Sequence, residues 1–172
     1  MATTTNYGYT VPDSTSHARI WEHFLTALQA VDTHIAAAVL QGYSNWTPAW
    51  TASGTAPAIG NGVRAGRYVQ VGKQVHAQGS IIMGSTTTMG TGVYGFSLPV
   101  TAASGAKAVG SAYLRDESAA ASGHFNGICV INPALSTTVL NLFNVASQVG
   151  ATAPFVPVST DSYAWTITYE AA

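Results

Sequence analysis

The stretch IWEHFLTALQAVDTHIAAAVLQG, residues 20–42, decides how this chain is organised. Its apolar residues recur at spacings of three and four until Gly42, and no later segment has a helical period. Such a stripe is buried only when another helix covers it, and the chain offers no second helix. The pattern therefore predicts a helix that packs against other copies of the same chain, through the seam Trp21, Phe24, Leu28, Val31, Ile35 and Ala38.

The residues of this seam favour three copies. Trp21 and Phe24 are too bulky for a tight seam of two helices, and Leu28 followed by β-branched Val31 leans away from dimers. The sequence therefore predicts a homotrimer with a short coiled-coil stalk. An alternative stays open, in which the helix lies against the rest of its own chain, because its apolar face is widened by Ile20, Leu25 and Val39.

The chain divides into four expected segments. Residues 1–12 have no period and end in a proline, which is typical of an extended arm that orders against another protein. Asp13 or Ser16 can cap the helix, which we expect from about Ser14 to Gln41. The expected divisions are a docking arm at 1–12, a trimerising helix at 13–41, a linker at 42–46 and a β head at 47–172.

After the linker, short β-branched or aromatic runs alternate with Gly, Ser and Thr. The clearest hairpin is RYVQVGKQVH, residues 67–76, which alternates on both sides of a Gly-Lys turn. Eight such runs predict a mainly β head, an antiparallel β-sandwich or jelly roll. The expected strands are Ala49–Thr51, Arg67–Val71, Gln74–Met83, Tyr94–Val100, Val109–Asp116, His124–Ile131, Val139–Phe143 and Tyr163–Tyr169.

The composition limits the kinds of partner that this chain can bind. Charged residues are 8% of the 172, against roughly 25% in an ordinary soluble protein, and the net charge is −1. The chain therefore lacks a basic field for nucleic acid or an anionic membrane, and no apolar run is long enough for membrane insertion. Cys129 is the single cysteine and lies in an apolar run, which predicts a buried structural thiol.

Two motifs match patterns of binding sites, but each also has a simple structural explanation. Gly90-Thr-Gly92-Val-Tyr-Gly95 matches a dinucleotide-binding pattern, but a strand with a proline follows where a helix is needed, so a loop is expected. His17 falls at a seam position where three imidazoles could meet and bind a metal or an anion. A polar core position explains it as well, and we predict no metal and no cofactor.

The acidic residues of the head do not form an evident catalytic pair. Asp116 and Glu117 are neighbours and would point to opposite faces of a strand, whereas a glycosidase needs two carboxyls that face one sugar. Asp161 could complement one of them, but nothing requires it, and we predict no catalytic residues. The charge gathered at Arg115, Asp116, Glu117 and His124 indicates either a contact loop or a solvated hairpin.

Several segments together resemble a known family, the minor tail or fibre proteins of tailed phages that infect actinobacteria. The amino-terminal part is similar through a Tyr-Gly-aromatic-x-x-Pro element before a helix with Trp21-Glu-His23. The similar segments are NYGYTVPDSTSHARIWEHFLTALQAVDTHI (6–35), WTPAWTASGTAPAIGNG (46–62), GRYVQVGKQVH (66–76), YGFSLPV (94–100) and APFVPVSTDSYAWTITYEAA (153–172).

This resemblance implies a homotrimeric appendage located in the virion, with its arm docked to a phage structural protein and its β head outward. The docking residues would be Tyr7, Tyr9, Val11 and Pro12, since tyrosines bring contact area and proline stiffens the entry to the helix. The head is then expected to adhere to host cell-wall glycan. The alternatives are a capsid head fibre or decoration protein without a specific ligand, and a glycan depolymerase.

Overall fold

The computed structural model describes the backbone of residues 2–3, 10–11, 20–39, 42–105, 107–145 and 147–172. In the helix it describes the side chains of residues 24–35. The chain forms two compact units, Met1–Gly42 and Tyr43–Ala172. The second unit is the head.

The first unit contains a pair of two-residue strands and a helix. Strand β1 (Ala2–Thr3) pairs antiparallel with β2 (Thr10–Val11), and α1 spans Ile20–Val39. The other residues of the expected helix, 14–19 and 40–41, lie outside the described part. Within α1, polar groups bond one turn back: the Thr33 hydroxyl donates to the Gln29 carbonyl at 2.8 Å.

The apolar stripe of α1 is partly exposed in the single chain. The side chains of Phe24, Leu28 and Ile35 are 51%, 48% and 54% exposed. Val31 is half-buried, and the side chains at the two ends of the predicted seam, Trp21 and Ala38, lie outside the description. Phe24, Leu28 and Ile35 therefore each keep about half of their surface exposed.

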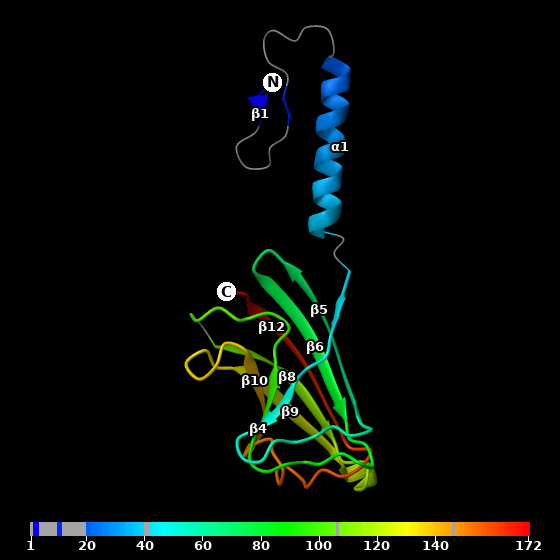
Figure 1. The fold of residues 1–172 in the computed structure, drawn as a ribbon, viewed down its shortest axis with the longest axis vertical. Helices are drawn as coiled ribbons and strands as arrows, with labels where there is room; N and C mark the ends of the chain where they lie inside the picture. The colour runs from blue at the N-terminus through cyan, green and yellow to red at the C-terminus, as the bar shows by residue number, and fades with distance from the viewer. Residues whose placement is uncertain (1, 4–9, 12–19, 40–41, 106, 146) are drawn as a thin grey trace. The chain divides into compact units, whose positions relative to one another are not determined.

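The head is built on one antiparallel sheet (Figure 1). The strands follow one another in the order β3-β5-β6-β12-β8-β9-β10-β7-β4, and β11 pairs with β10. A short 3-10 helix, η1 (Ala120–Ser122), lies between β8 and β9. The strands are β3 (Ser44–Trp46), β4 (Trp50–Ala52), β5 (Val63–Val71), β6 (Gln74–Ile82), β7 (Tyr94–Ser97), β8 (Ala108–Arg115), β9 (His124–Ile131), β10 (Val139–Asn144), β11 (Ser147–Gln148) and β12 (Ser162–Glu170).

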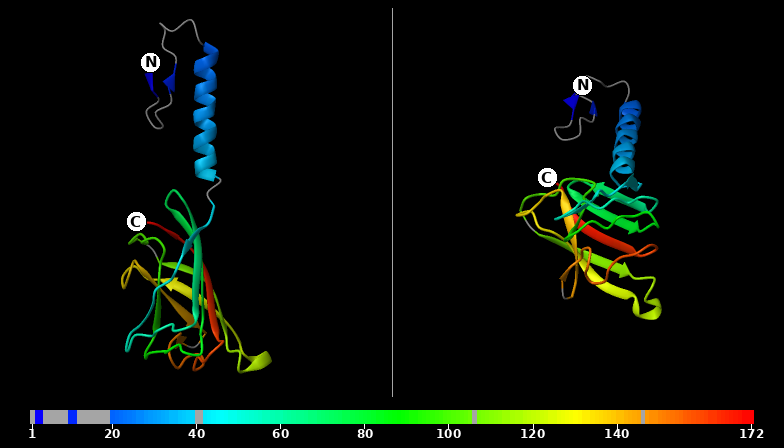
Figure 2. Two further views of the ribbon diagram at one scale, coloured as in Figure 1. Left: turned by 45° about the vertical axis from the view of Figure 1, so that its right-hand side comes forward. Right: turned by 60° about the horizontal axis from the view of Figure 1, so that its bottom comes forward.

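The sheet curls until it folds over itself. Its two end strands, β3 and β4, are joined by only residues 47–49, which brings the two edges of the sheet close together. Phe96 on β7 and Trp165 on β12 are four strands apart in the sheet, yet their ring centroids lie 4.6 Å apart. Figure 2 shows this curl from two further directions. One face of the sheet therefore encloses the core, and the other faces outward.

The enclosed core follows the strand period of two. On β6 and β12, alternate residues are buried while the residues between them are more exposed. Side chains from at least six strands meet in one cluster, including Val75, Phe96, Leu114, Ile131, Leu140 and Tyr163. Cys129 is fully buried among them, and burial raises the pKa of its thiol to about 12. The prediction of a buried structural thiol is confirmed.

Two glycines leave room for two indole rings in this core. Gly66 on β5 and Gly79 on β6 are direct cross-strand partners. A Cβ atom at Gly66 would lie 2.3 Å from the Trp46 ring, and one at Gly79 would lie 2.4 Å from the Trp165 ring. The two indoles meet edge to face at 6.4 Å between centroids. Glycine is therefore required sterically at both positions, because any side chain would overlap an indole.

All eight predicted strands of the head are found; β9 has the predicted bounds, and the other seven differ at one or both ends. The β5–β6 hairpin turns at Gly72 and Lys73 as expected, with Gly72 at a φ of +58°. The G-x-G-x-x-G match precedes and enters strand β7 rather than a helix, so the loop interpretation is confirmed. The linker prediction needs a correction, because residues 44–46 pair with β5 as strand β3. Strand β11 and residues 63–66 of β5 were not predicted.

Candidate functional site

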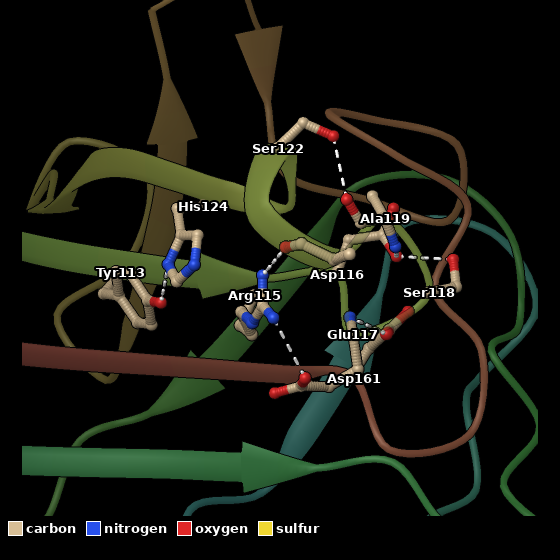
Figure 3. Close-up of polar contacts among 10 residues, drawn as sticks. Tyr113, Arg115, Asp116, Glu117, Ser118, Ala119, Ser122, His124 and Asp161 are labelled. Carbon is tan, nitrogen blue, oxygen red and sulfur yellow. Dashed lines mark hydrogen bonds and ion pairs between the residues drawn. The ribbon is translucent and has the colours of Figure 1, made fainter.

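The loop between β8 and β9 gathers the charged residues that the sequence singled out (Figure 3). Arg115, at the end of β8, donates from Nη1 to the Ala120 carbonyl at 2.6 Å. Its Nη2 pairs with the Glu117 carboxylate at 3.1 Å. The guanidinium therefore closes the loop on itself, bridging its two halves.

Asp116 also bonds within this loop. Its Oδ1 accepts hydrogen bonds from the Ser118 hydroxyl at 2.6 Å and from the Ala119 amide at 3.1 Å. Its own backbone amide donates to the Gly123 carbonyl at 2.9 Å. A Cβ atom added to Gly123 would collide with the backbone carbonyl of Asp116. The carboxylate thus has the geometry of a turn-forming aspartate.

Asp161 anchors the loop from another part of the chain. It is fully buried, and its Oδ1 accepts from the Glu117 amide at 2.8 Å while its Oδ2 accepts from the Val158 amide at 2.7 Å. The sequence alone indicates Asp161 only as an acid that could complement Asp116 or Glu117. Both of its oxygens instead tie backbone amides of two separate loops together, as Figure 3 shows for the Glu117 side.

His124 lies at the other side of the same hairpin. Its Nδ1 is within hydrogen-bonding distance of the Tyr113 hydroxyl, and the two rings are tilted at 5.9 Å between centroids. All four residues of the predicted contact loop therefore have a bonding partner inside the head. This arrangement gives the loop a defined shape, while Glu117 and His124 remain exposed.

A second feature, which the sequence did not indicate, is an open groove of about 760 Å³ on the outer face of the sheet. We call it the outer groove. It runs across β5, β6, β12, β8 and β9, which are neighbours in the sheet. Its lining side chains belong to two adjacent rows of cross-strand partners.

The first row provides the floor of the outer groove. Ala65 pairs with Ser80, and Ser80 pairs with Ala164 on the other side. These three short side chains leave a hollow where longer ones would fill the space. The row continues to Tyr113, opposite Ala164, and then to Asn126, opposite Tyr113. The ring of Tyr113 is 39% exposed at this end.

The second row is polar and carries the charge. Asn45 pairs with Arg67, Arg67 with Gln78, Gln78 with Thr166, and Thr166 with Ser111. Arg67 is the one charged side chain among the described residues that line the groove. A groove with one guanidinium, several amides and hydroxyls and one exposed aromatic ring can hold a polar ligand of modest charge.

Other predicted sites are described only in part. Of the docking residues, Val11 has a described backbone in β2, paired with Ala2, while Tyr7, Tyr9 and Pro12 lie outside the described residues. His17 does too. In the part of the chain that the structure describes, no three His, Cys, Asp or Glu side chains are grouped as a metal site would need. No described helix has both the length and the apolar character of a membrane span.

No protein-family model, no curated protein and no solved structure matches this chain. Two features of the described residues bear on function. One is the half-exposed apolar stripe of α1, and the other is the outer groove of the head.

Proposed function

We propose that this chain is a homotrimeric structural appendage of a phage virion, a tail fibre or minor tail protein, whose head adheres to a glycan of the host cell surface. The proposal includes a trimeric coiled coil formed by α1 and a head of the β-sandwich or jelly-roll class. The observation that carries it is the apolar stripe of α1, where Phe24, Leu28 and Ile35 are each about half exposed in one chain.

The stripe favours self-association on energetic grounds. Complete burial of a large apolar side chain stabilises a protein by about 1.5–3 kcal/mol relative to full exposure. Six seam positions together offer on the order of 10 kcal/mol per chain, which copies of the same helix can recover when they pack side by side. An isolated amphipathic helix of 20 residues gains none of this, since its stripe faces water.

The head supports adhesion rather than a charge-driven interaction. The whole chain has six basic and seven acidic residues, so no strong field attracts a polyelectrolyte. The outer groove instead offers hydroxyls, amides and an exposed tyrosine ring. These are the groups that bind sugars, whose rings have an apolar face and a rim of hydroxyls. The phage assignment itself rests on the resemblance of the sequence.

Light scattering on the purified full chain tests the assembly. We expect a mass of three times 17.7 kDa, or 53.1 kDa. A mass of 17.7 kDa at micromolar concentration would exclude both the coiled coil and the trimer. Placement is tested separately with antibody-labelled virions, where label on the tail supports a fibre and label on the capsid supports a head decoration.

Docking through the amino-terminal arm has its own test. Removal of residues 2–12 should leave the mass and the melting temperature of the purified protein nearly unchanged, while incorporation into particles is lost. Truncated protein found in virions at the normal copy number would place the docking surface elsewhere on the chain.

A further inference from the structure

We infer that the outer groove is a binding site for a saccharide that carries a carboxylate, with Arg67 as the residue that recognises the acid. The inference deepens the adhesive role proposed above and rests on it, since it names the site and the chemical class of the ligand. Three features of the groove carry it: the hollow floor, the position of Arg67 and the tyrosine at the far end.

The floor has space for a sugar ring. Ala65, Ser80 and Ala164 lie side by side on β5, β6 and β12, and the hollow above this part of the sheet encloses about 760 Å³ with the rest of the groove. Ligand sites of small molecules have volumes of roughly 300–1,000 Å³. A surface made only of long side chains would not leave such a space, so the small residues define where a ligand can lie.

Arg67 is held in place by contacts that leave its binding end free. Its Nε donates to Gln78 Oε1 at 3.0 Å, and its guanidinium carbon lies 4.8 Å from the centroid of the Tyr43 ring. Neither terminal nitrogen has a hydrogen-bond partner among the described residues. Two parallel N–H groups on a fixed guanidinium match the two oxygens of a carboxylate, which is the most favourable pairing for arginine.

The neighbours of Arg67 contribute a hydrogen-bond donor and no negative charge. Because Gln78 Oε1 accepts from Arg67, its amide nitrogen remains as a donor. No described acid of the head forms an ion pair with Arg67. Asp161 is buried, Asp116 bonds within its loop, Glu117 pairs with Arg115, and Glu170 lies opposite Gln74 at the end of β12. The groove therefore has one uncompensated positive charge, which favours an anionic ligand over a neutral one.

The far end of the groove suits the apolar face of a sugar. Tyr113 presents a partly exposed ring, and its hydroxyl contacts His124, which restrains the ring. Asn126, its direct partner on β9, has an exposed side chain with no hydrogen-bond partner among the described residues. A sugar ring that stacks on Tyr113 can thus bond to the Asn126 amide, while a carboxylate on another sugar of the same saccharide meets Arg67, because three strand spacings of about 4.8 Å each separate β5 from β8.

The experiment compares two sugars that differ only at C6. Saturation-transfer NMR titrations of the full-length protein with D-glucuronate and with D-glucose should give tighter binding of glucuronate by about tenfold or more, since the acid makes a charge-assisted contact. Added salt should weaken only the glucuronate complex. Equal affinity for the two sugars, or tighter binding of glucose 6-phosphate than of glucuronate, would overturn the assignment of a carboxylate.

Substitutions locate the site. Arg67→Gln should remove the preference, so that both sugars bind with the same affinity, and the matched control Lys73→Gln should retain it. Ala164→Trp fills the floor and should abolish binding of both sugars, with an unchanged melting temperature showing that the head still folds. A preference that survives Arg67→Gln would overturn the role of Arg67.

The same variants separate this inference from the proposed assembly. If the groove were instead a contact between copies of the chain, Ala164→Trp would change the mass in light scattering, and that result would overturn the inference. A monomeric wild-type protein that still prefers glucuronate would contradict only the trimer. A trimeric protein with no preference would contradict only the ligand.

Discussion

The carboxylate of Asp161 and the backbone amide of Glu117 lie 2.8 Å apart although 44 residues separate them in the sequence. This contact fixes the loop between β8 and β9 against the segment that leads into β12. Because Asp161 also binds the Val158 amide, one buried side chain holds two loops at the same end of the head.

Asp161→Asn should destabilise the head strongly. An amide keeps one acceptor oxygen but places an NH₂ donor against a backbone N–H, so one buried donor loses its partner. The expected loss in the free energy of unfolding is about 2–3 kcal/mol, measured by urea denaturation. As a control, Glu117→Gln keeps the amide contact and loses only a partly exposed ion pair, which should cost less than about 1 kcal/mol. Equal losses in the two variants would contradict this role of Asp161.

Gly79→Ala should destabilise the core through a steric overlap. The added Cβ would lie 2.4 Å from the Trp165 ring, and the indole cannot move far because Phe96 and Trp46 pack against it. We expect a loss of about 1–3 kcal/mol in thermal or chemical denaturation. Gly105→Ala is the matched control, since a Cβ there meets nothing within 4 Å, and its effect should stay within about 0.5 kcal/mol.

Two buried tyrosines should respond oppositely to loss of the hydroxyl. The Tyr163 hydroxyl is buried without a partner among the described residues, whereas the Tyr94 hydroxyl donates to the Met89 carbonyl at 2.8 Å. Tyr163→Phe should therefore be neutral or stabilising by up to about 1 kcal/mol, and Tyr94→Phe should cost about 1 kcal/mol. Destabilisation by Tyr163→Phe that equals or exceeds that of Tyr94→Phe would indicate a partner for the Tyr163 hydroxyl.

The head should lose stability in alkaline solution. Burial raises the pKa of Tyr94 and of Tyr169 to about 12, above the ordinary value of about 10. Between these values the unfolded chain gives up the phenolic protons while the folded head keeps them, so the contribution of these two tyrosines to stability is complete below about pH 10 and falls as pH rises toward 12. Melting temperatures across this range should show the decline.

The double variant Tyr94→Phe/Tyr169→Phe isolates this titration, because phenylalanine has no proton to lose. Its melting temperature starts lower, since both tyrosines lose hydrogen bonds, but its decline with pH should be shallower than that of the wild-type protein. A slope identical to wild type would assign the alkaline loss to other groups.

Leu28→Asp should break the proposed assembly. The variant places one carboxylate per copy in the seam, with no opposite charge to pair with it. Light scattering should show a shift from 53.1 kDa toward the 17.7 kDa of a single chain, and Val31→Asp should behave alike. Gln29, which lies outside the predicted seam, provides the control. If Gln29→Asp dissociated the protein as readily as Leu28→Asp, the predicted seam would be wrong.

Local patterns in the sequence were enough to find the elements. The spacing of three and four predicted α1, and the alternation from Arg67 to His76 around Gly72 predicted the longest hairpin. Both signals depend on residues close together in the chain, where the period of a helix or a strand directly sets which side chains share a face. Strand β3 was missed because three residues are too few for such a pattern, and its pairing with β5 is a long-range contact.

The sequence by itself determined that this chain has one helix with an apolar stripe, a β head of alternating strands, a buried thiol and very little charge. Only the tertiary structure decided which strands are neighbours, and therefore that Arg67, Ala164 and Tyr113 line one groove. Alternation tells which face of a strand a residue occupies, but it does not tell which strand lies beside it, because that depends on the register of segments up to about a hundred residues apart. The same reason hid Asp161, whose partners are backbone amides that any residue carries.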